Sequence, residues 1–128
     1  MKLKIINLEG IYLSLDVDSI VIKTIAGELT ILNKHLPLIT ICEISILKIK
    51  KDGVYQNYAL AGGTLFVDEN EVKIMTSAIE SEQEIDYNRA IKAKQRALDR
   101  LNDPKSDIKR AEIALKRAMN RLSLTVKE

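Results

Sequence analysis

The spacing of the apolar residues changes once along this chain, near residue 81. Before that point apolar and polar residues alternate, as at Leu13 and Leu15, which is the period of a half-buried strand. After it, Ala90, Ala93 and Ala97 recur at a spacing of three or four residues, which is the period of a helix. Each period fits only one kind of element, so the sequence predicts a β part followed by a helical part.

The β part consists of short apolar runs separated by turn signals. Asp52-Gly53 stands between two strand patterns, and Asp-Gly strongly favours a tight hairpin. Other turn-forming residues at Glu9-Gly10, 26–28, 33–35 and 68–70 divide this part into seven to nine short strands. Strands of this length with tight connections predict an antiparallel β-sandwich or barrel.

The helical part is expected to be an antiparallel two-helix hairpin. Residues 102–104 end in proline, which interrupts a helix, and Ser106 or Asp107 can cap the second helix. The facing surfaces of the two helices are mostly alanine, so they bury little apolar area. At ~25 cal/mol per Å² of buried area, their contact contributes only a modest stabilising free energy. We therefore predict an α+β fold, with a β-sandwich at residues 1–84 and a hairpin at 85–128 that detaches more easily than the sandwich unfolds.

Charge divides the chain at nearly the same place. Residues 1–80 carry eight lysines and ten acidic residues, whereas residues 81–128 carry twelve basic residues and eight acidic ones. All six arginines follow residue 88. This distribution indicates an acidic partner for the tail, either nucleic acid, nucleotide or an acidic protein surface. The alternative is an ordinary solvated helix face.

Composition argues against several classes of protein. The single Cys42 cannot form an intramolecular disulfide, and His35, the only histidine, has no nucleophile or metal-ligand partner in the pattern. Aromatic residues are 4% of the chain and precede the helical pattern, so the basic region has no stacking platform for nucleic acid. No apolar run approaches the ~18 residues of a spanning helix. We predict a non-catalytic cytosolic chain whose membrane contact comes only through a partner.

Four segments resemble the epsilon subunit of bacterial F-type ATP synthase. They are Gly-Glu-Leu-Thr-Ile-Leu-Asn-Lys-His-Leu-Pro-Leu at 27–38, Ala-Gly-Gly-Thr-Leu-Phe-Val at 61–67, Ile-Asp-Tyr-Asn-Arg-Ala at 85–90, and the basic helical run at 109–122. They occur in the family's order over essentially the whole chain. Thr30 replaces a glycine, Asn33-Lys34 replaces Pro-Gly, and Phe66 stands where the family often has Glu. In the turn at Asn33-Lys34, Asn33 can adopt the left-handed backbone conformation that such a turn needs.

The resemblance implies a central-stalk subunit that couples ion translocation to ATP synthesis. It implies that the sandwich contacts the gamma subunit and the ring of c subunits through Gly27, Glu28, His35 and Pro37. It also implies that the extended hairpin inhibits ATP hydrolysis at the alpha and beta subunits, and the basic face expected to do so comprises Lys109, Arg110 and Lys116. The expected location is the cytoplasmic face of the bacterial cell membrane, within the complex. The alternative is a basic-tailed nucleic-acid-binding module or another regulatory binding module.

No cofactor is expected to be required, but ATP is a candidate regulatory ligand. An antiparallel hairpin brings Asp86 level with Arg121 and Arg89 level with Arg117, and paired guanidinium groups suit phosphate. Similarity to nucleotide-binding epsilon subunits implies an ATP site at Glu80, Ile85, Asp86, Arg89, Ala90, Arg96, Arg117 and Arg121. The alternative is that these charges only form salt bridges that close the hairpin.

Overall fold

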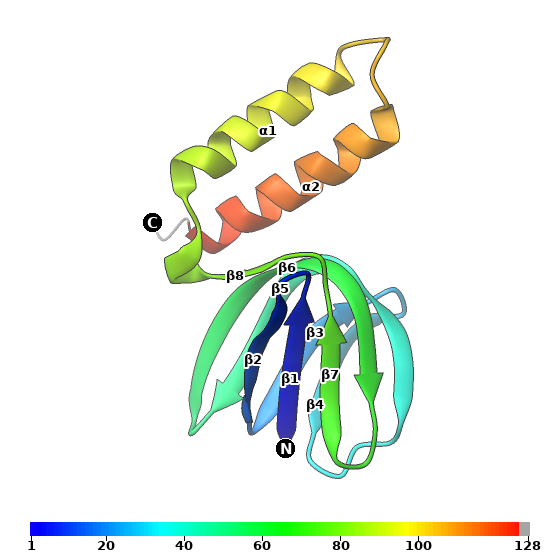
Figure 1. The fold of residues 1–128 in the computed structure, drawn as a ribbon, viewed down its shortest axis with the longest axis vertical. Helices are drawn as coiled ribbons and strands as arrows, with labels where there is room; N and C mark the ends of the chain where they lie inside the picture. The colour runs from blue at the N-terminus through cyan, green and yellow to red at the C-terminus, as the bar shows by residue number, and fades with distance from the viewer. Residues whose placement is uncertain (126–128) are drawn as a thin grey trace.

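The computed structural model describes residues 1–125 and contains a β-sandwich followed by a helical hairpin, which confirms the predicted fold class (Figure 1). The described elements are β1 (Lys2–Asn7), β2 (Gly10–Asp16), β3 (Ser19–Thr24), β4 (Gly27–Leu32), β5 (Leu38–Lys51), β6 (Val54–Val67), β7 (Glu71–Met75), β8 (Ile79–Ser81), the 3-10 turn η1 (Glu82–Glu84), α1 (Tyr87–Leu101) and α2 (Ile108–Thr125).

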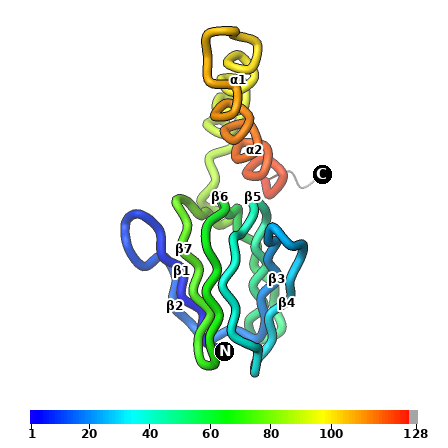
Figure 2. Tube along the Cα trace, turned by 90° about the vertical axis from the view of Figure 1, so that its right-hand side faces the viewer, coloured from blue at the N-terminus to red at the C-terminus, as the bar shows by residue number. Residues whose placement is uncertain are grey.

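The strands form a sheet in the order β2-β1-β7-β6-β5-β3-β4, with β8 added to β6. The sheet folds over on itself, so that β1 and β7 lie across from β3 and β4 (Figures 1 and 2). The long strands β5 and β6 connect the two layers and are joined by the predicted hairpin, in which Asp52 and Gly53 have φ angles of 51° and 78°. Pairing is antiparallel except between β1 and β7, which run parallel.

The core of the sandwich comes from the alternating residues on the inner faces of these strands. Leu3 and Ile5 of β1, Ile20 and Ile22 of β3, and Ile74 of β7 are fully buried. Each such side chain contributes roughly 1.5–3 kcal/mol relative to an exposed one. The sandwich therefore has a large aliphatic core of its own.

Gly62 and Gly63 have a structural role, as expected for glycine inside a strand. A Cβ atom at Gly63 would lie 2.1 Å from the carbonyl oxygen of Met75, and the residue has a φ of 137°. Only glycine lets β6 approach β7 this closely. The pair thus belongs to the framework of the sandwich.

The hairpin stands at one end of the sandwich, and α2 is the helix that lies against β5 and β6 (Figure 2). Asp86 caps α1, because its carboxylate accepts a hydrogen bond from the Arg89 N–H, and Asp107 caps α2 in the same way through the Arg110 N–H. The predicted alanine seam is present: its buried members are Ala90, Ala97, Ala111 and Ala118. Neither helix of the described chain is long and apolar enough to cross a membrane.

Two details differ from the expectations. Lys34, and not Asn33, takes the left-handed conformation, with a φ of 63°, because it occupies the position of the glycine in the Pro-Gly pair that the family has here. Helix α1 begins at Tyr87, whose ring is half exposed, so one aromatic residue does lie in the basic hairpin.

Candidate functional site

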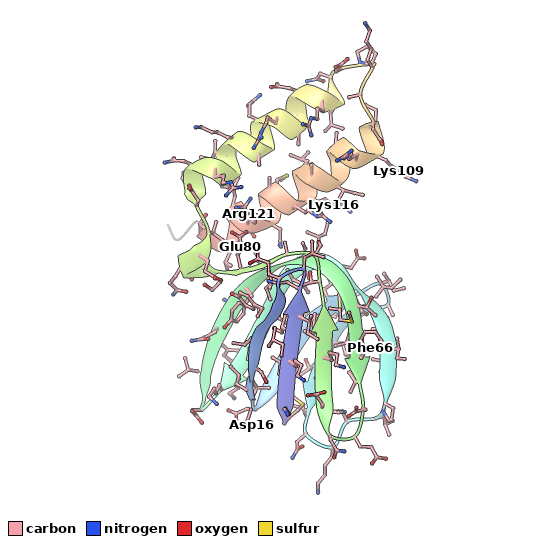
Figure 3. The ribbon with its side chains drawn as sticks, viewed as in Figure 1. Asp16, Phe66, Glu80, Lys109, Lys116 and Arg121 are labelled. Carbon is pink, nitrogen blue, oxygen red and sulfur yellow. The ribbon has the colours of Figure 1, made fainter. Side chains whose placement is uncertain are left out.

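An ion pair joins the hairpin to the sandwich. The Arg121 Nε on α2 lies 2.7 Å from Oε1 of Glu80 on β8, and the two labelled side chains face each other in Figure 3. The Nε contact lacks hydrogen-bond alignment, whereas Nη2 donates to Oε2 of Glu80 at 3.4 Å. Both residues belong to the implied ATP set, and β8 places Glu80 just before the linker to α1. The pair thus connects the last strand of the sandwich with the last turns of α2.

Asn120 makes a second connection, which the sequence reading did not identify. Its Nδ2 donates to the backbone carbonyl of Ser45 on β5 at 2.9 Å and to that of Leu60 on β6 at 3.3 Å. Asparagine has a low helix propensity, and its position inside α2 was the signal available in the sequence. Its amide therefore holds α2 to two strands at once.

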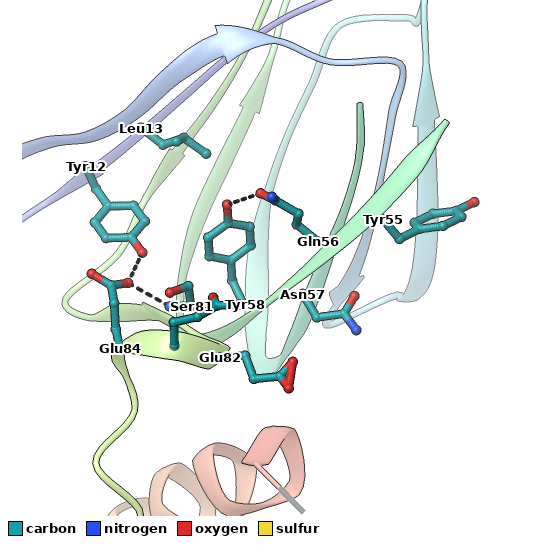
Figure 4. Close-up of a pocket in the computed structure, with 10 residues that line it drawn as sticks. Tyr12, Leu13, Tyr55, Gln56, Asn57, Tyr58, Ser81, Glu82 and Glu84 are labelled. Carbon is teal, nitrogen blue, oxygen red and sulfur yellow. Dashed lines mark hydrogen bonds between the residues drawn. The ribbon is translucent and has the colours of Figure 1, made fainter. Parts of the chain in front are cut away.

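The linker between the sandwich and α1 has its own anchor. The Tyr12 hydroxyl of β2 donates to Oε1 of Glu84, and the Ser81 N–H donates to the same oxygen at 2.7 Å (Figure 4). Partial burial raises the pKa of Glu84. The hydrogen bonds from the Ser81 backbone, the Tyr12 hydroxyl and the Ser81 side chain together outweigh this effect and hold the carboxyl pKa below its ordinary value. Burial, together with the bond to Glu84, raises the pKa of Tyr12. The linker is thus fixed to the sandwich up to Glu84.

This anchor lines an open hollow of about 570 Å³ beside η1. The hollow is bordered by three tyrosines, polar side chains and acidic residues from β2, β6 and η1, as the close-up shows (Figure 4). Tyr12 and Tyr58 meet there edge to face, with 6.2 Å between ring centroids. The aromatic contact and the hydrogen bonds together stiffen the end of the sandwich from which the hairpin departs.

The implied ATP residues are only partly gathered. Asp86 caps α1 rather than pairing with Arg121, and within residues 1–125 the Glu80–Arg121 contact is the only ion pair that any of the arginines makes. Ala90 is fully buried in the helix seam, so its side chain is not available to a ligand while the two helices are closed. Ile85 is half-buried, and Arg89, Arg96 and Arg117 are exposed.

The ion pairs therefore do not support the alternative in which the charges close the hairpin. In the described residues no salt bridge connects α1 with α2, and the one arginine that is paired bonds to the sandwich. Glu80, Arg117 and Arg121 do line one hollow between α2 and the sheet, with a volume of about 150 Å³. That is below the ~300–1,000 Å³ of typical ligand pockets. A nucleotide would need the hollow to widen or would lie partly on the surface.

The implied rotor residues fall into two separate places. Gly27 and Glu28 begin β4, whereas His35 and Pro37 lie beyond its other end. The four strand residues that follow Glu28, at ~3.3 Å each, and the start of the next loop separate the two pairs. A single partner that touches both pairs must extend along β4.

The outer face of the sheet carries an apolar patch near these loops. The strand register places Ile39 of β5 beside Phe66 of β6, and Ile41 beside Thr64, which in turn pairs with Met75 of β7. Ile39 is 72% exposed, Ile41 54% and Met75 46%. We call Ile39, Ile41, Phe66 and Met75 the outer patch; Phe66 is labelled in Figure 3. Contiguous exposed apolar side chains of this kind are typical of interaction surfaces.

The implied basic face lies along α2. Lys109 and Arg110 are exposed in its first turn, at the end far from the sandwich, whereas Lys116 is nearer the sheet (Figure 3). Lys116 borders a second hollow between α2 and the sandwich, together with Lys23, Glu43 and Met119. In this docked arrangement the three residues do not form one compact patch.

Residues 1–125 contain no group of three side chains able to hold a metal ion. His35 is half-buried in its loop, and its Nδ1 has no hydrogen-bond partner there. Cys42 is buried, and burial raises the pKa of its thiol to about 11, so it is protonated at neutral pH.

Family comparisons agree with this two-part structure. The model of the ATP synthase delta/epsilon chain β-sandwich domain matches residues 1–82, and that of the delta/epsilon chain long α-helix domain matches residues 83–125. The chain belongs to the ATP synthase delta/epsilon family. An ATP synthase epsilon chain of Caldicellulosiruptor bescii is 40% identical, covering 96% of this chain and 91% of the relative. One from Bacillus velezensis is 38% identical, covering 97% and 96%.

A solved structure extends the likeness to the fold. A chain in the mitochondrial ATP synthase of Euglena gracilis aligns with a TM-score of 0.80 and 25% identity, covering 92% of this chain and 76% of that one. This member of the delta/epsilon family is therefore a non-catalytic subunit of ATP synthase, and within that complex it is a peripheral part of a membrane assembly.

Proposed function

We propose that this delta/epsilon-family chain is a rotor-bound regulatory subunit whose sandwich stays attached while its hairpin moves. The observation that carries the proposal is that few contacts attach the hairpin to the sandwich in the described residues. Helix α2 supplies the main contact with the sandwich, and its polar attachments there are Asn120 and Arg121. Small-residue packing and the two attachments found within residues 1–125 suit a switch whose states differ by only a few kcal/mol.

The sandwich is the part that we assign to the rotor. The outer patch on β5, β6 and β7 offers an apolar surface for the gamma subunit, and the loop containing His35 and Pro37 is the segment we assign to the ring of c subunits. Phe66 fits this role, because it places an aromatic ring on the middle strand of the patch, beside Ile39, where the family often has a carboxylate. The subunit would then lie at the cytoplasmic face of the membrane, within the complex.

The hairpin is the part that we assign to inhibition of ATP hydrolysis. Once it leaves the sandwich, the basic face of Lys109, Arg110 and Lys116 would be free to meet acidic surfaces of the alpha and beta subunits. Replacing these three residues by alanine should raise ATP hydrolysis by the assembled complex without loosening its hold on gamma. Replacing Lys92, Lys94 and Arg100 of α1 by alanine is the control for lost charge. Equal hydrolysis in both variants would argue against the assigned face.

ATP is the regulatory ligand that we propose for the docked state. Glu80, Arg117 and Arg121 already share a hollow, and Arg89 and Arg96 are exposed on the neighbouring helix. A ligand at ~100 times its Kd stabilises the state that binds it by roughly 2.7 kcal/mol, enough to move a balanced switch. Falling ATP would then release the hairpin.

Calorimetric titration of the isolated chain with ATP tests this part. Arg121→Ala should weaken binding by at least fivefold, whereas Arg100→Ala, at the far end of α1, should leave it unchanged. No heat of binding at millimolar ATP, or equal affinity in the wild type and Arg121→Ala, would contradict the ATP site. Glu80 and Arg121 would then only attach the hairpin to the sandwich.

A further inference from the structure

The docking of the hairpin depends on a small area of α2. In Figure 1, α2 crosses the end of the sandwich and α1 lies beyond it, so that α1 reaches the sheet mainly through α2. Three alanines, Ala59, Ala61 and Ala78, border the hollow between the sandwich and α2, together with Ile44 and Leu60. Each alanine buries little apolar area, so directional polar contacts have a large share in deciding where α2 sits.

Asn120 makes a contact that few other side chains could replace. A single nitrogen, Nδ2, donates one N–H to the carbonyl of Ser45 and the other to that of Leu60. Ser45 and Leu60 are cross-strand neighbours in the β5–β6 ladder, and a carbonyl oxygen has a second lone pair to accept such a bond. The two acceptors belong to the backbone, so they are present whatever side chains the strands carry.

The position of Asn120 in α2 strengthens this interpretation. Asparagine is a poor residue for a helix interior, and alanine there would favour the helix itself. Asn120 is half-buried and borders the hollows on both sides of α2, one with Glu80 and Arg121 and the other with Lys23 and Met119. It therefore lies at the middle of the contact, where its cost to the helix is offset by its two bonds to the sheet.

We propose that Asn120 is the positioning residue of the docked hairpin, and that its amide recognises the paired carbonyls of Ser45 and Leu60. It sets both the place at which α2 sits and part of the free energy that retains it. The inference rests on the proposed function in one respect, that the hairpin is the element that moves. Asn120 acts without ATP, whereas Arg121 serves both the docking and the nucleotide.

Hydrogen exchange of the backbone amides in the isolated full-length chain tests the proposal. Asn120→Ala should make the amides of residues 115–125 exchange about tenfold faster or more, because two hydrogen bonds that retain the helix are lost. The amides of β1 and β7 should be unaffected. Asn120→Asp should have a larger effect, since it replaces both donors by a carboxylate that faces two carbonyl oxygens.

The matched control is Ser123→Ala on the same helix. Ser123 is exposed and donates only to the Asn120 carbonyl of its own helix, so its replacement raises helix propensity without changing the docking contact. Both alanine variants should favour the helix, and propensity alone would therefore slow exchange in both. Faster exchange in Asn120→Ala with unchanged or slower exchange in Ser123→Ala supports the proposal. Unchanged or slower exchange in Asn120→Ala overturns it.

A spectroscopic measurement adds a readout that a packing role alone would not change. The two side-chain amide protons of Asn120 should exchange slowly with solvent, whereas those of the exposed Asn88 should exchange at the rate of a free amide; equal rates would contradict the paired bonds. The rate of ATP hydrolysis by the assembled complex tests separately whether the hairpin inhibits. If exchange rises in Asn120→Ala while hydrolysis stays unchanged, Asn120 positions the hairpin but the hairpin does not inhibit.

Discussion

Arg121 of α2 and Glu80 of β8 come together with 2.7 Å between Nε and Oε1, although they are separated by the whole hairpin in sequence. Their side chains are 22% and 30% exposed, so solvent screens the pair only in part. We expect a double-mutant cycle with Arg121→Ala and Glu80→Ala to give a coupling free energy of about 1 kcal/mol in the unfolding of the chain. A coupling near zero in urea unfolding would mean that the contact does not retain the hairpin.

A chain that ends at Glu84 should fold without the hairpin. The core residues of the sandwich all precede this point, β8 is paired to β6, and Tyr12 anchors Glu84 itself. Circular dichroism should show a β spectrum and one cooperative thermal transition. An unfolded spectrum at 20–25 °C would contradict the division into a self-sufficient sandwich and an added hairpin.

Gly63→Ala should destabilise the sandwich severely, by more than ~3 kcal/mol, because the new Cβ would meet the Met75 carbonyl and the backbone conformation is strained for alanine. Gly53→Ala is the control for strain alone, since nothing lies within 4 Å of its Cβ position. It should cost about 1 kcal/mol. Similar losses in the two variants, measured by urea unfolding, would show that β6 and β7 can move apart.

The bond between Tyr12 and Glu84 should make the stability of the linker depend on pH. Because hydrogen bonds lower the pKa of Glu84, its contribution is fully present above the ordinary ~4.3 and is lost as pH falls through the folded-state pKa. The pKa of Tyr12 is raised by burial and by Glu84, so its contribution is present below ~10 and is lost as pH rises further.

Tyr12→Phe should therefore be less stable than the wild type at pH 7, and the difference should shrink near pH 3. Thermal unfolding at the two pH values measures it. Tyr55→Phe is the control, because Tyr55 is exposed and its ring can keep its contact with Lys50. A difference that is the same at both pH values would mean that Glu84 does not carry the effect.

The sequence predicted those features that depend on neighbouring residues. The Asp52-Gly53 hairpin, a cap at Ser106 or Asp107 and the alanine seam follow from local turn chemistry and helical period. The structure contains all three, with Asp107 as the cap. The parallel pairing of β1 with β7 does not follow from period, because it depends on how distant strands are ordered in the sheet.

The candidate site was predictable only in part for a similar reason. Hairpin geometry gives the height of a residue along the helices but not the direction in which it faces. Hairpin geometry put Asp86 level with Arg121, but Asp86 caps α1 and Arg121 turns toward Glu80 on the sandwich. The low helix propensity of Asn120 was a signal in the sequence, but its acceptors are backbone atoms and could be identified only once α2 was placed on β5 and β6.

A cross-link that prevents the hairpin from leaving the sandwich tests the central claim most directly. Lys23 and Met119 border the same hollow from the sandwich and from α2, so cysteines at these positions can be joined by a short bis-maleimide. Cys42 should not compete, because its thiol is buried and burial raises its pKa to about 11. The two single-cysteine variants, treated alike, are the controls.

The measurement is the rate of ATP hydrolysis by the complex assembled with the cross-linked subunit. We expect the locked complex to hydrolyse ATP as fast as one carrying a subunit that ends at Glu84, and faster than either single-cysteine control. A locked complex that is inhibited as fully as the controls would contradict the claim that the hairpin must leave the sandwich to act.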